Sequence, residues 1–362
     1  MGNTGISRML RPIAITLGDP AGIGPEIIAK AFRDAPDDTR GCFVAGDVAT
    51  MRRAARWLSG AGRVGIPVAV MDAPQDALDL PARCIPVFQV DPPAAPIAVG
   101  RISAAAGAMA ARCVVWAADA ALRGDISALV TAPLNKEALA AAGAPHDKYP
   151  GHTEMLQARA AAFAGMTARE LPVRMMLAND ELRTVLVSIH VSLRTAIEAV
   201  TFDNVLQTLL ITQEALRALL GHAPRIAVAG LNPHAGEGGL FGMEEVDIIG
   251  PAVVAARSRG LDVHGPLAPD TVFMRARARI GLPGDFDVVV AMYHDQGLIP
   301  VKYLGLEKGV NVTLGLPIVR TSPDHGTAFD IAGTGTADAT SLIAAIRMAR
   351  SLCDARSACA RA

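Results

Sequence analysis

The chain has few of the features that mark secreted, membrane-bound or nucleic-acid-binding proteins. Its five cysteines are scattered, odd in number and without the spacing of a metal site, so we expect reduced thiols and a cytoplasmic protein. Basic residues number 34 and acidic residues 35, and this balance gives no electrostatic footprint for nucleic acid or an anionic membrane. Hydrophobic residues make up 51% of the sequence, but polar residues interrupt every run before it reaches the length of a membrane span. We therefore expect neither nucleic acid nor membrane among its partners.

The sequence also has no internal repeat and no long low-complexity linker. Residues 1–10 contain a short basic stretch without an apolar core or a small-residue cleavage site, so we interpret them as a loose tail. At 362 residues the chain is long enough for two domains, or for one domain with a large insertion.

What the chain does contain is an alternation of short apolar runs and helical segments. Apolar runs of this length, bounded by turn residues, predict the buried strands of an α/β fold. The predicted strands lie at residues 12–18, 42–46, 68–71, 85–90, 128–134, 173–178, 183–189, 225–231 and 288–294. Between them, alanine-rich and apolar segments predict helices, the longest of which ends at Gly124.

Three of the apolar runs end at or just before a histidine that a tight turn follows: His190, His234 and His294. Side chains just past the carboxyl ends of strands gather in the crevice where α/β folds bind ligands. Three neutral imidazoles there would make an open metal site. Each histidine alone would be an ordinary residue at a strand end, but three in the same local context favour the metal site.

Several carboxylates and one amide accompany these histidines. Asp295 directly follows His294, where it could bind the metal, hold a metal-bound water or act as a base; a surface turn is the alternative. Asp270 follows a short strand and is a weaker candidate. Beside His234, Asn232 and Glu237 could orient the imidazole. The alternative there is a flexible glycine-rich loop that merely covers the cleft.

Positive and polar residues downstream of His294 indicate a site for an anion. Lys302, Asn311 and Arg320 lie within twenty residues of one another in apolar and glycine-rich sequence. The planar fork of arginine suits a carboxylate or phosphate, and lysine supplies a point charge. Upstream, His152 and Thr153 begin a predicted helix, whose free N–H groups also favour an anion. Ordinary surface charge is the alternative for Lys302 and for Arg320 taken singly.

The order of motifs resembles that of a known family. GDPAGIGPE, PLNK, GHTE, SIHVSL, GLNPHAGEGG, GPLAPDT, MYHDQG, GVNVTLGLP and RTSPDHGTAFDIAG occur as in the PdxA family, the 4-hydroxythreonine-4-phosphate dehydrogenases of vitamin B6 synthesis. The resemblance covers nearly the whole chain. It implies two α/β domains around a cleft, similar to isocitrate and isopropylmalate dehydrogenases. The first domain would comprise residues 1–140 and 311–362 on the cofactor side, and the second residues 141–310 on the metal and dimer side.

The same resemblance implies roles for individual residues. The ligands of one divalent metal (zinc, magnesium or cobalt), at a site shared across a homodimer, would be His190, His234 and His294. The contacts to a small phosphorylated four-carbon acid would be His152, Thr153, Lys302, Asn311 and Arg320. A segment similar to the adenosine-binding loop of the related dehydrogenases takes the place of the usual glycine-rich fingerprint. Its residues for NAD or NADP would be His325, Gly326, Thr327, Ala328 and Asp330.

The implied reaction is the metal-dependent, NAD(P)-linked oxidation, with decarboxylation, of 4-hydroxythreonine 4-phosphate in pyridoxal phosphate biosynthesis. Asp295 or Asp270, acting directly or through Lys302, would remove the hydroxyl proton, and the sequence leaves this choice open. If two copies share the metal site, two inactive variants should restore each other when mixed, and His190→Ala with His294→Ala is the pair that the sequence suggests.

Other functions stay open at this point. HVSL, LFGMEE and DIAG differ from the pattern of the biosynthetic enzymes, which have HLPL and ELAG at two of these places. These departures resemble a second, catabolic branch that oxidises 4-phosphothreonate or 4-phosphoerythronate. A metal-dependent hydrolase would turn over without nicotinamide, and a non-catalytic binding protein would reduce no NAD at all.

Overall fold

The apolar runs form strands in the computed structural model, which describes residues 11–59, 65–92, 95–279 and 281–359. The chain divides into two units. Unit 1 comprises Met1–Ala164 and His325–Ile346, and unit 2 comprises Gly165–Asp324 and Arg347–Ala362. The expected loose tail, residues 1–10, lies outside the described residues.

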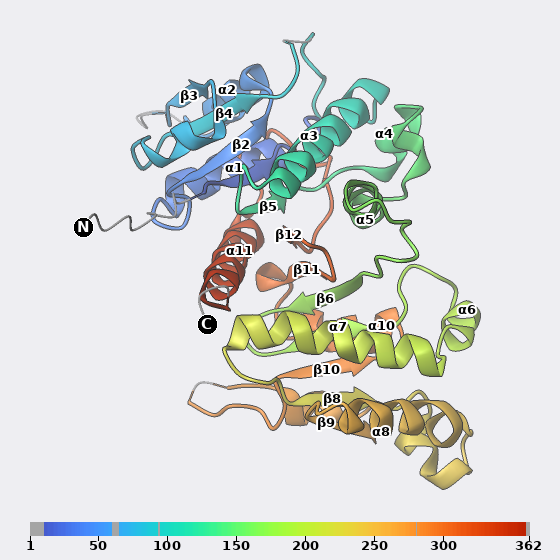
Figure 1. Cartoon of the computed structure of the whole chain (residues 1–362). Helices are drawn as coiled ribbons and strands as arrows, with labels where there is room; N and C mark the ends of the chain where they lie inside the picture. Colours follow the sequence, from blue (N-terminus) through green and yellow to red (C-terminus); the bar gives the residue numbers. More distant parts are fainter. Residues whose placement is uncertain (1–10, 60–64, 93–94, 280, 360–362) are drawn as a thin grey trace. The chain divides into compact units, whose positions relative to one another are not determined.

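The described part of unit 1 contains five parallel strands. β1 lies between β2 and β5, β2 pairs on its other side with β4, and β4 pairs with β3. Every residue of β1, β2 and β5 is buried, as expected for parallel strands covered on both faces. The order is β3 (Val68–Met71), β4 (Ile85–Gln89), β2 (Cys42–Gly46), β1 (Ile13–Thr16) and β5 (Ala128–Thr131) (Figure 1).

The longest helix of unit 1 is α3 (Ala104–Arg123), a core helix. The hydroxyl of Ser103 accepts the N–H of Ala106 at its start, and Gly124 ends it in the left-handed conformation. By length and composition α3 could cross a membrane, but half of its residues are buried and it packs on β1, β2 and β5. The other helical segments are α1 (Gly24–Asp34), α2 (Val48–Trp57), η1 (Pro74–Leu78), α4 (Lys136–Ala141), η2 (His146–Lys148) and α5 (His152–Phe163).

The described part of unit 2 contains a mixed set of seven strands. β12, β11, β6 and β7 pair antiparallel in that order, and β7, β10, β8 and β9 continue as parallel neighbours. Their bounds are β12 (Val319–Pro323), β11 (Val310–Leu314), β6 (Arg174–Ala178), β7 (Arg183–Leu186), β10 (Val288–Ala291), β8 (Ile226–Ala229) and β9 (Val263–Leu267). Three adjacent parallel strands, β7, β10 and β8, therefore end at the same edge.

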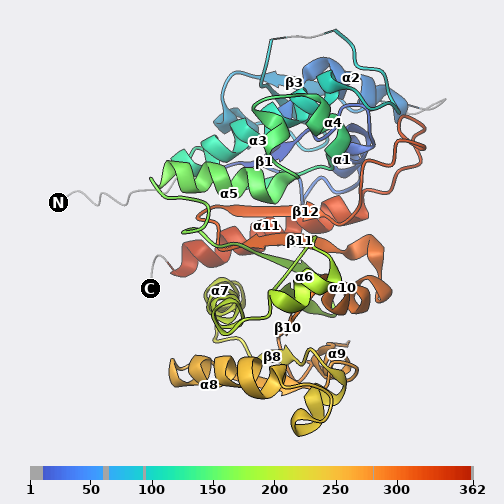
Figure 2. The ribbon, with the colours of Figure 1, turned by 90° about the vertical axis from the view of Figure 1, so that its right-hand side faces the viewer.

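Helices of unit 2 pack beside these strands, and α7 lies against α8 (Figure 2). An apolar cluster that includes Leu186 of β7 and Ala291 of β10 also takes in Leu298 and Val301 of α10, so it fixes the helix that begins at His294. The bounds are α6 (Leu193–Glu198), α7 (Phe202–Leu220), η3 (Pro233–Gly239), η4 (Glu245–Ile249), α8 (Gly250–Ser258), α9 (Val272–Ala276), α10 (His294–Tyr303) and η5 (Leu306–Lys308). α11 (Thr340–Cys359) is divided between the units.

The unit boundaries differ from the predicted domain boundaries. Residues 141–164 belong to unit 1, because α5 packs against α3. Residues 311–324 belong to unit 2, because β11 pairs along its length with β6. Of the C-terminal part of the chain, unit 1 contains only His325–Ile346, whereas the prediction assigned all of 311–362 to the first domain.

Candidate active site

The three predicted metal ligands follow three adjacent strands of unit 2. His190 follows β7, His294 follows β10, and His234 follows β8. β10 pairs in parallel with β7 on one side and with β8 on the other. The shared edge that the apolar runs predicted is therefore present, and all three histidines belong to it.

The structure brings His190 and His294 next to each other. Val187 donates its N–H to the carbonyl of Ala291 at 2.9 Å, and the Ser188 hydroxyl donates to the carbonyl of Met292 at 3.0 Å. These bonds continue the β7–β10 pairing beyond the end of β7 and hold the backbone segments that lead to the two histidines side by side. Their ring centroids lie 5.6 Å apart.

His234 lies in a different kind of segment. Residues 234–239 all have positive φ angles, and 234–238 lie in or near the left-handed region, which makes η3 a left-handed turn. For residues other than glycine this conformation costs about 1–2 kcal/mol each. His234 is exposed, and its ring lies 6.1 Å from that of Phe241. Within the described ranges no group of three or more His, Cys, Asp or Glu side chains is placed to hold a metal, so the complete ligand set stays a prediction.

Glu245, which sequence reasoning missed, holds this turn in place. Its Oε1 accepts the backbone N–H groups of Leu231 and Asn232, both at 2.7 Å. The Asn232 side chain, predicted to orient His234, instead donates to Glu244 and Glu245 at 2.7 and 2.9 Å. Glu245 is buried. The acidic pair just after the glycine-rich loop was the only signal for it.

Gln296 links the turns that follow β10 and β8. Its Oε1 accepts the N–H of Met292 at 2.7 Å, and its Nε2 donates to the carbonyl of Gly230 at 2.7 Å. The two turns that carry His294 and His234 are thus joined by one side chain.

The two candidate base carboxylates differ in their contacts. Asp295 Oδ1 lies 2.6 Å from His294 Nδ1, while the Asp295 side chain remains 71% exposed. A carboxylate on Nδ1 leaves Nε2 of the imidazole for a ligand, as is usual for metal-binding histidines. Asp270 is exposed in the turn between β9 and α9.

Lys302 has a carboxylate partner that the sequence did not reveal. Its Nζ lies 2.5 Å from Oδ2 of Asp324, whose side chain is only 11% exposed. Lys302 is near the end of α10, and Asp324 directly follows β12. Asp324 stands within the RTSPDHG motif, where the positive charge of Arg320 is the more conspicuous feature.

Asn311 and Arg320 lie on one face of the β11–β12 pair. Asn311 stands opposite Ser322, and Arg320, two residues before Ser322 on the same strand, points to the same face. Arg320 is buried and donates to the hydroxyl of Thr313 at 3.1 Å. The buried Oδ1 of Asn311 accepts no hydrogen bond from the described residues. A buried guanidinium with an amide on the same face suits a polar or anionic ligand.

The remaining predicted contacts belong to unit 1. His152 and Thr153 are the first residues of α5, and both are half-buried. His325, Gly326, Thr327, Ala328 and Asp330 form a loop in which Ala328 has a φ of 39°. The backbone N–H of Ile23, just before α1, donates to the carbonyl of Thr327 at 2.9 Å.

Asp19 is a buried carboxylate in the turn between β1 and α1. Its Oδ1 accepts the N–H of Ala21 at 2.8 Å, and its Oδ2 has no hydrogen-bond partner among the described residues. Burial raises the pKa of Asp19, and the Ala21 bond offsets part of this effect. In the sequence, the motif that contains Asp19 indicates only the start of a helix.

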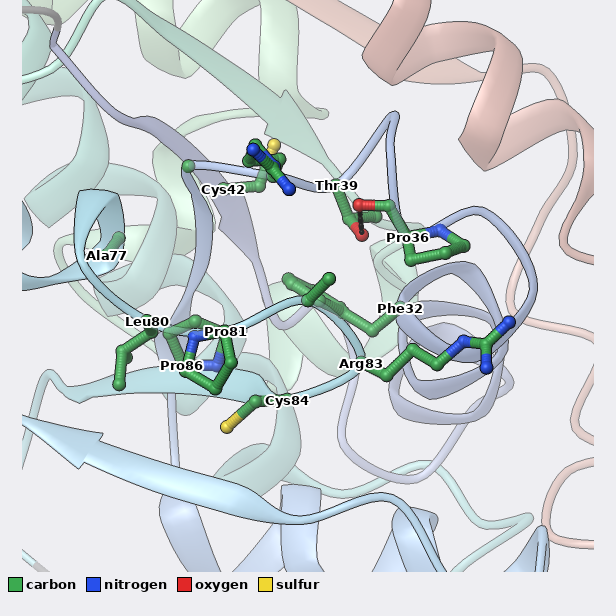
Figure 3. A pocket seen from close by; sticks show the side chains of 13 residues that line it. Phe32, Pro36, Thr39, Cys42, Ala77, Leu80, Pro81, Arg83, Cys84 and Pro86 are labelled. Carbon is green, nitrogen blue, oxygen red and sulfur yellow. Dashed lines mark hydrogen bonds between the residues drawn. The ribbon is translucent and has the colours of Figure 1, made fainter.

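Two hollows in the described surface contain none of the predicted site residues. One, in unit 1, is small and lined by residues that include Phe32, Arg83 and Cys84 (Figure 3). The other, in unit 2, is lined mainly by charged residues such as Glu181 and Arg277, which form an ion pair with each other. Their linings carry neither the imidazoles nor the buried guanidinium that the chemistry requires.

Three histidines follow neighbouring strands of one α/β unit, which also contains the buried Arg320 and the ion-paired Lys302, and such groups suit an enzyme that binds an anionic substrate. Residues 38–349 match the family described as "Pyridoxal phosphate biosynthetic protein PdxA". The chain belongs to the PdxA family, and it is an oxidoreductase that acts on a CH–OH group. The family and the α/β fold class expected from the sequence are thereby confirmed.

Relatives carry two different names. The chain is 53% identical to a 4-hydroxythreonine-4-phosphate dehydrogenase from Beijerinckia indica over 91% of this chain and 92% of the relative. It is 44% identical to a D-threonate 4-phosphate dehydrogenase from Salmonella typhimurium over 94% and 99%. A solved structure of a 4-hydroxythreonine-4-phosphate dehydrogenase from Klebsiella pneumoniae has a TM-score of 0.81 and 42% identity, over 95% of this chain and 98% of that one.

Proposed function

We propose that the chain is a metal-dependent, NAD(P)-linked dehydrogenase that oxidises and decarboxylates 4-hydroxythreonine 4-phosphate in pyridoxal phosphate biosynthesis. The observation that carries the proposal is the placement of His190, His234 and His294 after three adjacent parallel strands, in a chain 53% identical to a relative of that name. The alternative, a dehydrogenase of 4-phosphothreonate or 4-phosphoerythronate, is supported by the relative named for D-threonate 4-phosphate.

The donor set fits a divalent metal. His190 and His294 lie side by side, and Asp295 on Nδ1 of His294 leaves Nε2 for the ion. Imidazole nitrogen suits zinc and cobalt better than magnesium, which prefers oxygen. When bound, such an ion lowers the pKa of a coordinated hydroxyl and acts as a Lewis acid.

The residues of the chain would bind the substrate and accept its proton. Arg320, Asn311 and Lys302 supply polar groups for phosphate or carboxylate in unit 2, and His152 and Thr153 supply theirs in unit 1. Asp295 already contacts His294, so we assign it to orienting the imidazole. The proton acceptor is then Asp270, acting directly or through Lys302. A relay requires the neutral amine of Lys302, and Asp324 holds Nζ of that side chain in position.

The cofactor proposal rests on the loop of unit 1. NAD or NADP would bind at His325, Gly326, Thr327, Ala328 and Asp330, and its nicotinamide would accept the hydride. The N–H of Ile23 anchors the loop at Thr327. The RTSPDHGTAFDIAG motif, which contains the loop, resembles the adenosine-binding loop of related dehydrogenases.

A homodimer is supported by exposed apolar side chains of unit 2. They occur in two segments that adjoin predicted ligands: residues 191–202 after His190, and residues 240–246 after His234. The residues are Val191, Leu193, Ile197, Phe202, Leu240, Phe241, Met243 and Val246. Apolar groups at this density mark a surface for another protein, and a second copy would place them beside a shared metal. Cytoplasmic location is supported by four cysteines that carry reduced thiols, Cys42, Cys84, Cys113 and Cys353.

A substrate panel tests the proposal. 4-Hydroxythreonine 4-phosphate, 4-phosphothreonate and 4-phosphoerythronate are each supplied with NAD and with NADP, with and without a chelator, and absorbance is followed at 340 nm. Reduction that the chelator abolishes, fastest with the amino acid, supports the biosynthetic enzyme. A preference for the hydroxy acids supports the catabolic one. Release of phosphate without reduction of nicotinamide would support a metal-dependent hydrolase instead.

His294→Ala tests the metal assignment in the same assay, with His222→Ala as the control. His222 is an exposed histidine of unit 2 whose ring contacts the carbonyl of Ala223, away from the predicted ligands. The metal bound per chain should fall in the first variant and stay at the wild-type level in the second. Unchanged metal content in both variants would contradict the assignment of His294 as a metal ligand.

A further inference from the structure

Helix α1 carries a buried ion pair between Glu26 and Lys30. Glu26 Oε1 lies 3.2 Å from Lys30 Nζ, and the two side chains are 0% and 11% exposed. Removing two charges from water costs several kcal/mol for each, and their mutual attraction compensates only when further hydrogen bonds satisfy both groups. The hydrogen-bond partners of Glu26 and Lys30 therefore indicate the role of the pair.

Those partners are backbone groups of residues 333–337, about 300 positions further along the chain. Glu26 Oε2 accepts the N–H of Gly333 at 3.2 Å, and Oε1 accepts that of Ala337 at 2.9 Å. Lys30 Nζ donates to the carbonyl of Gly335 at 2.8 Å and also to that of Ala337. Toward this segment the carboxylate accepts from N–H groups and the ammonium donates to carbonyls, so both the donors and the acceptors of one backbone segment are bound.

The start of α1 makes a second anchor on the same loop. The N–H of Ile23 donates to the carbonyl of Thr327, and a Cβ atom at Gly22 would lie 2.8 Å from that carbonyl oxygen. The loop is thus attached at Thr327 and at residues 333–337 to one short stretch of unit 1. Residues 328–332, which include two proposed cofactor contacts, Ala328 and Asp330, lie between the anchors.

We propose that Glu26 and Lys30 are positioning residues for the dinucleotide: the buried pair fixes the backbone of the 325–337 loop before the cofactor arrives. The inference rests on the proposed function for the identity of the ligand. Stability of α1 alone would be served as well by two apolar side chains, since a buried pair is often no better than a hydrophobic substitute. What apolar side chains cannot supply is four directed bonds to a distant loop. Rigidity of the free loop removes an ordering cost from binding.

Two variants test the proposal with a control on the same helix. Lys30→Met keeps the apolar stem and removes the charge and both donated bonds, while Glu26→Gln removes the charge and one acceptor. The control is Asp34→Asn, because Asp34 pairs with Arg33 at the surface of α1. Lys30→Arg retains the charge and the donors and serves as the conservative variant.

The first readout needs no ligand. Hydrogen–deuterium exchange of peptides covering residues 325–337 in the free protein should be about tenfold faster or more in Lys30→Met and Glu26→Gln, since each loses bonds worth about 1.4 kcal/mol or more. Exchange should stay at the wild-type rate in Asp34→Asn and return toward it in Lys30→Arg. Unchanged exchange in both folded variants overturns the proposal. Loss of the whole circular dichroism signal in both also overturns it, because the pair would then serve the fold at large.

The second readout is affinity for NAD, measured by fluorescence titration, together with the steady-state constants. The dissociation constant and the KM for NAD should rise about tenfold to a hundredfold, with kcat at saturating NAD changing less than threefold. A fall in kcat with unchanged affinity overturns a positioning role. If wild-type protein binds neither NAD nor NADP, the proposed function fails, and the exchange experiment still decides whether the pair orders the loop.

Discussion

At the scale of single residues, metal binding by a histidine depends on which of its ring nitrogens a neighbouring carboxylate contacts. Asp295 takes Nδ1 of His294 and thereby selects Nε2 for any ligand. A second aspartate–histidine pair occurs elsewhere in unit 2, where Asp262 Oδ1 lies 2.8 Å from the other ring nitrogen, Nε2, of His264. His264 is not a predicted ligand, so this second pair offers a matched comparison.

Asp295→Asn should weaken metal binding about tenfold to a hundredfold, because a carboxylate that orients a ligating imidazole is worth that much. Asp262→Asn removes a pair of the same type and should leave metal affinity unchanged. Both are measured by competition with a chromogenic chelator. Equal losses in the two variants would mean that general electrostatics, rather than orientation of His294, is responsible.

Asp19 gives a pH-dependent prediction. Since burial raises its folded pKa above the ordinary 3.8, the folded state holds the proton to higher pH than the unfolded state does. The free energy of unfolding therefore falls as pH rises from 3.8 through the raised pKa, by about 1.4 kcal/mol for every tenfold difference between the folded and unfolded acid dissociation constants. Asp19→Asn lacks this loss, so its stability relative to wild type should be greater at about pH 7 than at about pH 3.5 in urea denaturation.

Asp338 supplies the control of opposite sign. Hydrogen bonds from Thr340 lower the pKa of Asp338, which stabilises the fold above pH 3.8 and ceases to do so as pH falls through the lowered value. Asp338→Asn should therefore be less stable than wild type at about pH 7, with a smaller difference at low pH. If Asp19→Asn behaved in this way too, the Asp19 carboxylate would be stabilised rather than strained by its site.

At the scale of elements, the existence of nine strands follows from the sequence, but their ends, the strands β11 and β12 and the shape of one turn do not. All nine predicted strands are found, because short apolar runs between turn residues have few other solutions. The left-handed turn at residues 234–238 was not predicted. It depends on Glu245 accepting N–H groups from the start of the turn, a contact over more than ten residues that no local pattern specifies.

The strained turn makes a prediction that reverses the usual effect of glycine. Ala235 has φ 54° and ψ 44°, so Ala235→Gly should relieve left-handed strain and raise or preserve the free energy of unfolding, by up to about 1 kcal/mol. Ala255→Gly, inside α8, should lower it by about 1 kcal/mol. Thermal denaturation of the two variants is the measurement. Destabilisation of equal size in both would show that the turn relaxes without strain.

The candidate site was predictable where it followed strand ends and not where it depended on partners. His190, His234 and His294 stood out because three apolar runs end in the same way. Asp324 and Glu245 did not, since each acts through a contact made only after distant segments fold together. The predicted domain limits differ from the unit limits for a similar reason: the pairing of β11 with β6 has no local sequence signal.

At the scale of the whole molecule, the closeness of His190 and His294 changes which pair of inactive variants should restore activity when mixed. His190 and His294 are neighbours within one chain, so a mixture of His190→Ala with His294→Ala would leave both half-sites of a dimer damaged. If the partner supplies His234, mixing His234→Ala with His294→Ala leaves one half-site intact in each mixed dimer. Random exchange then restores about one quarter of wild-type activity.

The measurement is activity after verified subunit exchange, with the His190→Ala and His294→Ala mixture as the control. Recovery in the first mixture alone supports a site divided as described. Recovery in the control mixture would mean that His190 and His294 serve different sites, and recovery in neither would mean that one chain provides all three ligands.

The connection of α1 to residues 333–337 also has a consequence for synthesis on the ribosome. Glu26 and Lys30 emerge early, whereas the carbonyl and N–H groups that satisfy them emerge about 300 residues later. Chains grow at about 5–20 residues per second, so unit 1 waits for tens of seconds with two charged side chains that it cannot yet bury. During that interval α1 must stay open to water or to a chaperone. Unit 1 therefore closes late, although most of its sequence is made first.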